Sequence, residues 1–463
     1  MDQDKQSSTP NAATGTSRDG FTSSFGVLAA TLGSAVGLGN IWKFPYLTGT
    51  NGGASFLVVY IIATLLVGLP VMISEIMLGR KAKADAVTTF QKLAPAGQPW
   101  WLISASGVLA AFLIIAFYSE VAAWVFAYVF KAIGGAILSS DPKVTSAAFK
   151  TLISDPVQAL LWQWLVLLLI GGILLLGVAK GIEAVTKKLM PLLFVLLLVV
   201  AVRSLMLPGA MKGVEFLLAP DFSRLSAGVV LTAVGLAFFK LSIGMGTMMT
   251  YGSYFRDNQN IPATTLRVMG ADLFVSMLAG LAIFPAVFAF GFAPGAGPSL
   301  LFITIPAVFA SMPLGHVFMV VFFVLAAIAS TGALLSLLEV PVSVMSGRLG
   351  ISRKRATVIN LLVLALIGSG CALSNSTLSG FTLFGKTLFD LFDFLTSNIL
   401  LPLGGIFICL FVGYVWGLAR LKQALSNEGA LENGRLVRVL FVLVRFVSPL
   451  LILVVMLRGL GVL

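Results

Sequence analysis

Long apolar runs recur along the chain and constrain its fold more than any other feature. Each run holds about 20 apolar residues, the length that crosses a bilayer as an α-helix. Only 10% of the residues are charged and 58% are hydrophobic, and a soluble chain of this length needs more charge to cover its surface. Backbone groups in lipid must be paired internally, and the alternating pattern of a membrane β-barrel is absent. The sequence therefore predicts an all-α membrane protein in a lipid bilayer.

Eleven candidate transmembrane helices can be counted between polar, proline and glycine clusters. Their approximate bounds are 23–46, 54–79, 100–134, 158–178, 184–206, 226–255, 262–292, 315–347, 355–374, 381–416 and 436–458. The stretch Ser299–Met312 is too short to span and contains Pro306, so we predict a re-entrant or surface hairpin there. Residues 1–20 are polar and predict a disordered cytoplasmic tail before a membrane domain over 21–463.

The net charge of +12 comes from Lys and Arg in short loops between the spans, which argues against a nucleic-acid partner. These residues gather in alternate loops, so the positive-inside rule places the N-terminus in the cytoplasm of a multi-pass protein of the cell membrane, plasma or inner. An odd number of spans then places the C-terminus outside. Cys371 and Cys409 lie inside apolar runs and predict core thiols.

Two spans are interrupted in mid-membrane by glycine and polar residues. The first interruption is Ser34–Asn40 and the second is Lys240–Gly246. Each opens a group of five spans, at about 23–206 and 226–416, and an extra helix follows at about 436–458. Close helix packing would explain one such glycine. Paired interruptions instead indicate a 5+5 inverted repeat with unwound helices 1 and 6, in which free amides and carbonyls form a transport site.

These segments resemble the neurotransmitter:sodium symporter family, which has the leucine-transporter fold. The run Gly33–Pro45 is similar to the family's first-helix signature, and Asn51–Gly53 with Tyr60 also fits. Phe302–Phe309 resembles its extracellular hairpin, and Phe238–Ser242 with Thr250–Tyr254 resembles its sixth helix. The resemblance, from about Arg18 onward, implies a secondary transporter with alternating access, not an enzyme. Bacterial members of the family commonly have 11 spans.

The resemblance also implies a substrate site at the two interruptions. The amides of Leu38 and Gly39, with the Tyr118 hydroxyl, would hold a carboxylate. An ammonium would be held by the carbonyls of Ala35 and Phe239 and the hydroxyl of Ser242. The side-chain pocket would be lined by Ile114, Phe239, Met245 and Leu337. Monoamine carriers have Asp at the position of Gly37, so glycine there implies an amino acid, and the apolar lining implies an apolar side chain.

Two gates are implied by the same resemblance. Lys43 and Asp393 stand where the family has its outer ion pair, with Lys in place of the usual Arg. Because Lys lacks the bidentate fork of Arg, we expect a looser gate. Arg18 and Phe21 fit the inner gate of the N-terminal segment. Gly347 occupies the place of the acidic inner partner, so we expect no conventional inner ion pair.

The first sodium site of the family is altered in two places. Its helix-6 hydroxyl and helix-7 Asn positions carry Lys240 and Asp272, while Ala35 and Asn40 remain. A buried Lys is tolerated when it is paired, so we expect its ammonium to replace sodium by a tethered charge. Lys240 would also contact the substrate carboxylate. A structural ion pair without a coupling role is the alternative.

Chloride is not expected to act on this chain. Tyr60 and Ser276 match the family's chloride site, but its Gln position is Leu236, and a carboxylate at Asp272 would repel an anion. We therefore predict a transporter without chloride dependence.

The second sodium site needs carbonyls at Gly33, Val36 and Ala329 and two hydroxyl ligands on span 8. The register places Gly332 and Ala333 at the hydroxyl positions, and hard cations want several oxygen ligands. We therefore predict transport that is insensitive to replacing sodium by choline. The alternative is a conventional sodium-coupled symporter, in which a two-residue shift brings in Ser330 and Thr331.

Other classes of protein lack their signatures in this sequence. A channel would show a ring of charges or carbonyls, and an intramembrane enzyme would show convergent catalytic groups, yet His316 is the only histidine. Neither a metal-ligand spacing nor a nucleotide loop is present, so we expect no cofactor, with sodium left open.

Overall fold

The computed structural model describes residues 20–294 and 300–463 and is almost entirely helical there. Arg18 and most of the predicted tail lie outside these ranges. The first half contains α1 (Ser24–Ala35), η1 (Gly39–Lys43), α2 (Phe44–Thr50), α3 (Ala54–Ala63), η2 (Thr64–Gly68), α4 (Leu69–Ala82), α5 (Ala86–Leu93), α6 (Trp101–Ile133), α7 (Pro142–Ser154), α8 (Pro156–Leu175), η3 (Val178–Glu183), α9 (Ala184–Leu205), α10 (Met211–Leu218) and η4 (Phe222–Arg224). The second half contains α11 (Ala227–Lys240), α12 (Thr247–Gly252), α13 (Ile261–Ala289), α14 (Thr304–Ala310), α15 (Gly315–Arg348), α16 (Arg353–Ala372), η6 (Leu373–Asn375), α17 (Leu388–Leu395), η7 (Thr396–Leu400), α18 (Leu401–Leu410), η8 (Phe411–Trp416), α19 (Gly417–Leu425), α20 (Gly434–Val442), η9 (Leu443–Val447) and α21 (Ser448–Gly459).

The helices agree with the predicted number of spans. Within the described ranges, nine helices are long and apolar enough to cross a membrane, and α1 with η1 and α2 makes a tenth span that bends by 49°. The shorter apolar helix α11 and, after the non-helical residues 241–246, the helix α12 correspond to the eleventh predicted span. The all-α fold with two interrupted helices is therefore confirmed. The boundaries of the two repeats remain a prediction.

Two local predictions differ from the structure or are refined by it. The tenth span begins at Leu388 and not near 381, because Leu383 and Lys386 form an antiparallel bridge around Phe384 and Gly385, which both have positive φ. Ser299 lies outside the described residues. The rest of the predicted hairpin is the short helix α14, which packs on α7, α13 and α15 and does not span.

Both interruptions expose backbone in the middle of the bundle. Helix α1 ends at Ala35, and Val36 is extended before the chain resumes as η1. After α11, the segment Leu241–Gly246 is non-helical and includes Ser242 at φ +52°. Positive φ is unfavourable for a residue with a side chain, so surrounding contacts must hold this turn. The unsatisfied backbone groups of four helix ends therefore meet here.

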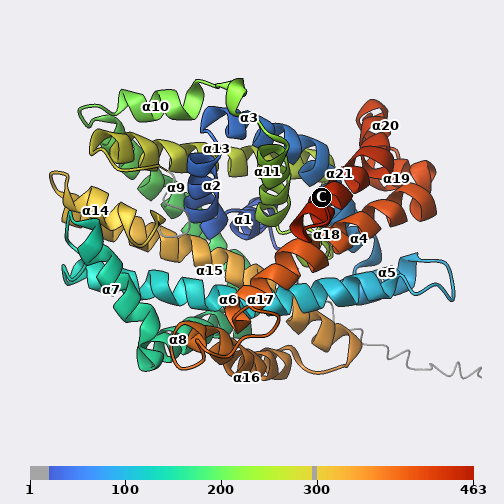
Figure 1. Ribbon diagram of the computed structural model, residues 1–463. Coiled ribbons are helices and arrows are strands. Elements are labelled where there is room, and N and C mark those ends of the chain that lie inside the picture. The colour runs from blue at the N-terminus through green and yellow to red at the C-terminus, as the bar shows by residue number, and fades with distance from the viewer. Residues whose placement is uncertain (1–19, 295–299) are drawn as a thin grey trace, which may run out of the picture.

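The interrupted helices lie at the centre of the bundle (Figure 1), with α1 against α9, α13 and α15 and with α11 against η1. The long helix α6 passes beside them. Helices α7 and α14 lie at one end of the view, and α5 and α19 lie at the other. The arrangement places the helix breaks about midway between the two ends.

Candidate functional site

A small cavity lies between the two helix breaks. Nine of the ten predicted substrate residues line it. The tenth, Leu38, does not line it but is hydrogen-bonded to Tyr118, which does. The lining residues are Ser34, Ala35, Gly37, Gly39, Ile114, Tyr118, Phe239, Lys240, Ser242, Met245, Ala333 and Leu337. Residues from α1, α6, α11 and α15 thus converge as predicted, while their roles toward a substrate stay predictions.

One wall of the cavity is formed by the backbone of the helix 1 break and by a tyrosine hydroxyl. The Leu38 amide donates to the Tyr118 hydroxyl oxygen at 3.1 Å, and the hydroxyl hydrogen is not used by that bond. A Cβ atom at Gly37 would lie 3.0 Å from Ala333 Cβ and 3.4 Å from the Tyr118 oxygen. Any side chain at position 37 would therefore intrude on the cavity, so the site requires glycine there.

Two hydrogen bonds hold the break between α11 and α12 in place. The Ser242 hydroxyl donates to the Ser34 carbonyl at 2.9 Å, which ties this turn to the break in helix 1. The Gly244 amide donates to the buried Glu75 carboxylate at 2.6 Å. The Ser34 hydroxyl is buried and has no partner among the described residues. It is therefore an additional polar group on the cavity wall.

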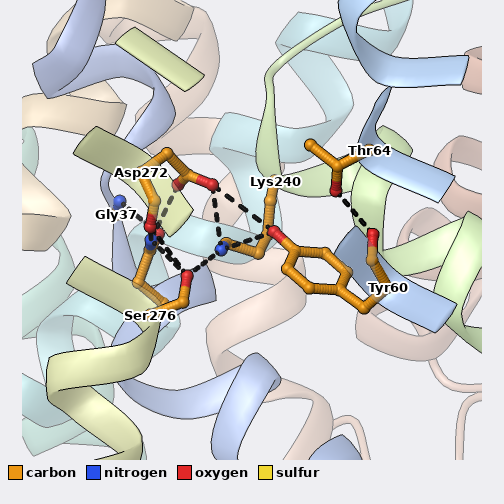
Figure 2. Close-up of polar contacts among 7 residues, drawn as sticks. Gly37, Tyr60, Thr64, Lys240, Asp272 and Ser276 are labelled. Carbon is orange, nitrogen blue, oxygen red and sulfur yellow. Dashed lines mark hydrogen bonds and ion pairs between the residues drawn. The ribbon is translucent and has the colours of Figure 1, made fainter. Parts of the chain in front are cut away.

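A buried ion pair stands beside the cavity (Figure 2). Lys240 Nζ lies 3.1 Å from Asp272 Oδ2, and both side chains are fully buried. The same ammonium donates to the Tyr60 hydroxyl at 2.8 Å and to the Ser276 hydroxyl. Asn40 Nδ2 donates to Asp272 Oδ1 at 2.7 Å, and Asn40 Oδ1 accepts from the Gly37 amide at 3.3 Å. The pair is thus connected through Asn40 to the break in helix 1.

This cluster occupies the place predicted for a sodium ion. An ammonium has three N–H donors, and Asp272, Tyr60 and Ser276 take one each, so none is left for a substrate carboxylate in this arrangement. The two hydroxyls assigned to the chloride site are engaged by the same ammonium. A sodium ion at this position would meet a fixed positive charge, so the residues present do not fit one.

The second sodium position retains carbonyls but lacks hydroxyls in the predicted register. A Cβ atom at Gly332 would lie 2.7 Å from the Gly33 carbonyl, and one at Gly37 would lie 3.8 Å from the Ala329 carbonyl. Helices α1 and α15 therefore approach closely here. The Ser330 and Thr331 hydroxyls both donate to the Ala327 carbonyl of their own helix, at 2.9 and 2.8 Å. In the predicted register, this position therefore offers carbonyls and no hydroxyl.

A larger vestibule leads from the cavity toward the end of the bundle that holds α7. Phe239 and Tyr118 line both spaces. Lys43 and Asp393 also line the vestibule, but they form no ion pair within 4.0 Å in the described ranges. Lys43 Nζ lies 3.8 Å from the centre of the Phe239 ring instead, and Asp393 accepts from Ser397. The predicted ion pair is therefore not formed in this conformation.

The opposite end is closed by an ion pair that the sequence did not reveal. Arg353 pairs with both carboxylate oxygens of the buried Glu339, and the Tyr254 hydroxyl donates to the same carboxylate. Phe21 packs edge-on against Tyr251 and Tyr254, with ring centres 5.6 and 5.7 Å apart. The expected lack of the conventional inner pair stays a prediction, because Arg18 lies outside the described residues, and Glu339 with Arg353 is a different ion pair at this end.

The molecule is, by its fold and this site, a multi-pass transporter with a binding cavity at paired helix breaks. A family model described as the sodium:neurotransmitter symporter family matches residues 18–140 and 150–462. The chain therefore belongs to that family, which is one of sodium-coupled transporters. The relatives are carriers, so the expectation that this chain is not an enzyme is confirmed.

Similar proteins span almost the whole chain. YhdH, a sodium-dependent transporter of Bacillus subtilis (strain 168), is 39% identical to this chain. The match covers 96% of this chain and 98% of YhdH. A taurine transporter of Bos taurus, called sodium- and chloride-dependent, is 26% identical over 86% of this chain and 72% of its own. The crystal structure of MhsT in complex with L-phenylalanine matches with a TM-score of 0.87 at 41% identity, over 96% and 100% of the two chains.

Proposed function

We propose that this protein carries an apolar amino acid across the membrane by alternating access. The observation that carries this proposal is the break in helix 1, where the Leu38 amide bonds Tyr118, which lines a cavity with the apolar side chains Ile114, Met245 and Leu337. Amides at a helix break suit a carboxylate, and the apolar wall suits the side chain. The complex of MhsT with L-phenylalanine supports the same class of ligand.

The substrate ammonium would lie at the acceptor side of the breaks. The Ala35 and Phe239 carbonyls and the Ser242 hydroxyl are the predicted acceptors, and the unpaired Ser34 hydroxyl adds another oxygen beside them. A zwitterion placed in this way would pair the Ser34 hydroxyl, which is otherwise buried without a partner among the described residues. Phe239 lies between the cavity and the vestibule and would cover the bound substrate.

The coupling we propose differs from that of a two-sodium carrier. The Lys240 ammonium replaces the first sodium ion, fixed by Asp272, and chloride has no site because the same ammonium engages Tyr60 and Ser276. A dependence on sodium can then come only from the second position. A single-sodium carrier is the second candidate, favoured by the sodium-dependent relatives and by Ser330 and Thr331 close to Ala329.

The orientation that we propose has the N-terminus in the cytoplasm of a cell-membrane protein. The Lys and Arg content of alternate loops supports it. The Phe21 gate and the Glu339–Arg353 pair then face the cytoplasm, and the vestibule faces outward. We propose one transport domain over 21–463 behind the short tail.

Counterflow of labelled amino acids in proteoliposomes tests the proposed function. We expect saturable counterflow of apolar amino acids, and Tyr118→Phe should weaken binding about 10- to 100-fold, because a hydrogen bond to a charged group contributes about 1.5–3 kcal/mol. Tyr128→Phe is the matched control, since its hydroxyl contacts the Phe302 carbonyl away from the cavity. Unsaturable flux, or equal binding by Tyr118→Phe and the parent, would refute the proposal.

A further inference from the structure

A basic cavity lies where helices leave the membrane region, far from the substrate site. Its volume is about 500 Å³, and its wall includes Lys81 at the end of α4, Lys92 at the end of α5, and Trp416, Arg420 and Gln423 around the start of α19. These elements are far apart in the sequence and meet at the α5 and α19 end of the bundle (Figure 1). No acidic side chain from the described ranges lines it.

The positive charge of this cavity is only partly balanced. Lys81 pairs with Glu428 at 3.0 Å, and its ammonium holds the pKa of that carboxyl below its ordinary value, so this pair stays ionised. Lys92 donates to the Ala82 carbonyl at 3.4 Å, and the Arg420 guanidinium lies 5.7 Å from the Trp416 ring centre. Neither cation has a carboxylate within 4.0 Å in the described part of the chain.

A buried tryptophan lies in the same wall. Trp416 is 7% exposed, and the Arg420 guanidinium lies over its ring. The cavity therefore presents two cations that lack a carboxylate partner among the described residues, which is the chemistry of an oxyanion site.

The position of the cavity indicates which oxyanion would enter. The span Ala54–Ala82 ends at it, and the 38-residue helix Leu388–Leu425 passes through it and runs well beyond the length needed to cross a bilayer. Lys81 and Trp416 therefore stand at the level where phospholipid headgroups lie, the level at which Trp and basic residues are enriched. Leu93 and Pro95 add an apolar rim for the start of an acyl chain.

We propose that this cavity is a binding site for the phosphate group of an anionic phospholipid. Lys92 and Arg420 bind the phosphate oxygens beside the Trp416 ring. The bound lipid joins the end of α5 to the start of α19 and so stabilises that end of the bundle. This inference does not depend on the identity of the transported substrate.

Binding of phosphatidylglycerol to the full-length purified protein tests the proposal. Native mass spectrometry measures how many lipid molecules remain bound to each protein molecule. We expect the double variant Lys92→Gln/Arg420→Gln to bind about 30-fold more weakly, since each Lys or Arg at a membrane surface contributes roughly fivefold. Lys143→Gln/Lys150→Gln, with the same charge change on α7, should bind as the parent does.

The remaining arms separate the possible ligands and complete the test. Phosphatidylcholine should bind no better to the parent than to the double variant, and inorganic phosphate should not displace phosphatidylglycerol. Counterflow by the variants shows that they are folded. Equal retention of phosphatidylglycerol by the parent and the folded double variant, or its displacement by inorganic phosphate, would overturn the proposal.

Discussion

At the scale of single residues, we propose that Lys240 takes the place of the first sodium ion. Its ammonium is buried and takes three partners, and one of them, Asp272, also binds Asn40 next to the helix 1 break. A mobile sodium ion can leave a site during the transport cycle, whereas a tethered ammonium cannot. The charge near the substrate carboxylate is therefore constant at this position in our account.

Removing only one member of this pair should damage the protein more than removing both. We expect Lys240→Ala to destabilise the fold by about 3–5 kcal/mol, because Asp272 would be left buried and unpaired. The double variant Lys240→Ala/Asp272→Ala should lose much less, and thermal unfolding of the purified proteins measures both. Additive effects of the two single changes would show that the pair does not interact.

The glycine at position 37 should be needed for its lack of a side chain. We expect Gly37→Ala to lower affinity for the amino acid, because its Cβ would meet Ala333 at 3.0 Å, and overpacking costs about 1–3 kcal/mol. Gly172→Ala is the matched control, since an added Cβ there meets nothing within 4 Å. Equilibrium binding checks the difference, and an unchanged affinity for Gly37→Ala would contradict the assignment of the cavity.

At the scale of elements, α15 is joined to the first turn of α16 by the ion pair between Glu339 and Arg353, which we call the clasp. Glu339 is buried in α15, and Arg353 at the first turn of α16 pairs with it, while Phe21 covers the neighbouring Tyr254. We propose that opening this end requires the pair to separate. The strength of the pair would then set how often the site opens on the Phe21 side.

A weaker clasp should expose the buried part of α15. We expect Arg353→Gln to increase alkylation of a cysteine introduced by Ser343→Cys, which lies one turn after Glu339 on the same helix face. The native Cys371 and Cys409 are buried and provide the background rate. Lys354→Gln should leave the alkylation rate unchanged, and an equal increase from both changes would exclude a specific role for the clasp.

The features that could be predicted from the sequence are those that depend on neighbouring residues or that match a known family motif. Lys240 and Asp272 stood out because charges inside apolar spans are costly when alone, and Glu75 carries the same signal, which was overlooked. The Glu339–Arg353 pair was missed because its partners meet only through the turn between two helices. The start of α17 was misplaced because the apolar residues Phe381 and Leu383 belong to a turn with its own bridge.

At the scale of the whole molecule, the topology is directly testable. With the N-terminus in the cytoplasm, the eleven spans predicted from the sequence place the C-terminus after α21 on the outside. We expect a C-terminal alkaline phosphatase fusion to be active, and the same enzyme fused in the loop after Arg348 to be inactive. The reverse pattern would contradict the proposed orientation.

The most direct test of the account is equilibrium binding of the amino acid to the purified protein while choline replaces sodium and gluconate replaces chloride. We predict no effect of chloride and no cooperative dependence on sodium, because Lys240 holds the first ion position. We also predict that Lys240→Thr/Asp272→Asn introduces a new dependence on sodium. A steep, cooperative dependence on sodium in the unmodified protein would contradict the central claim.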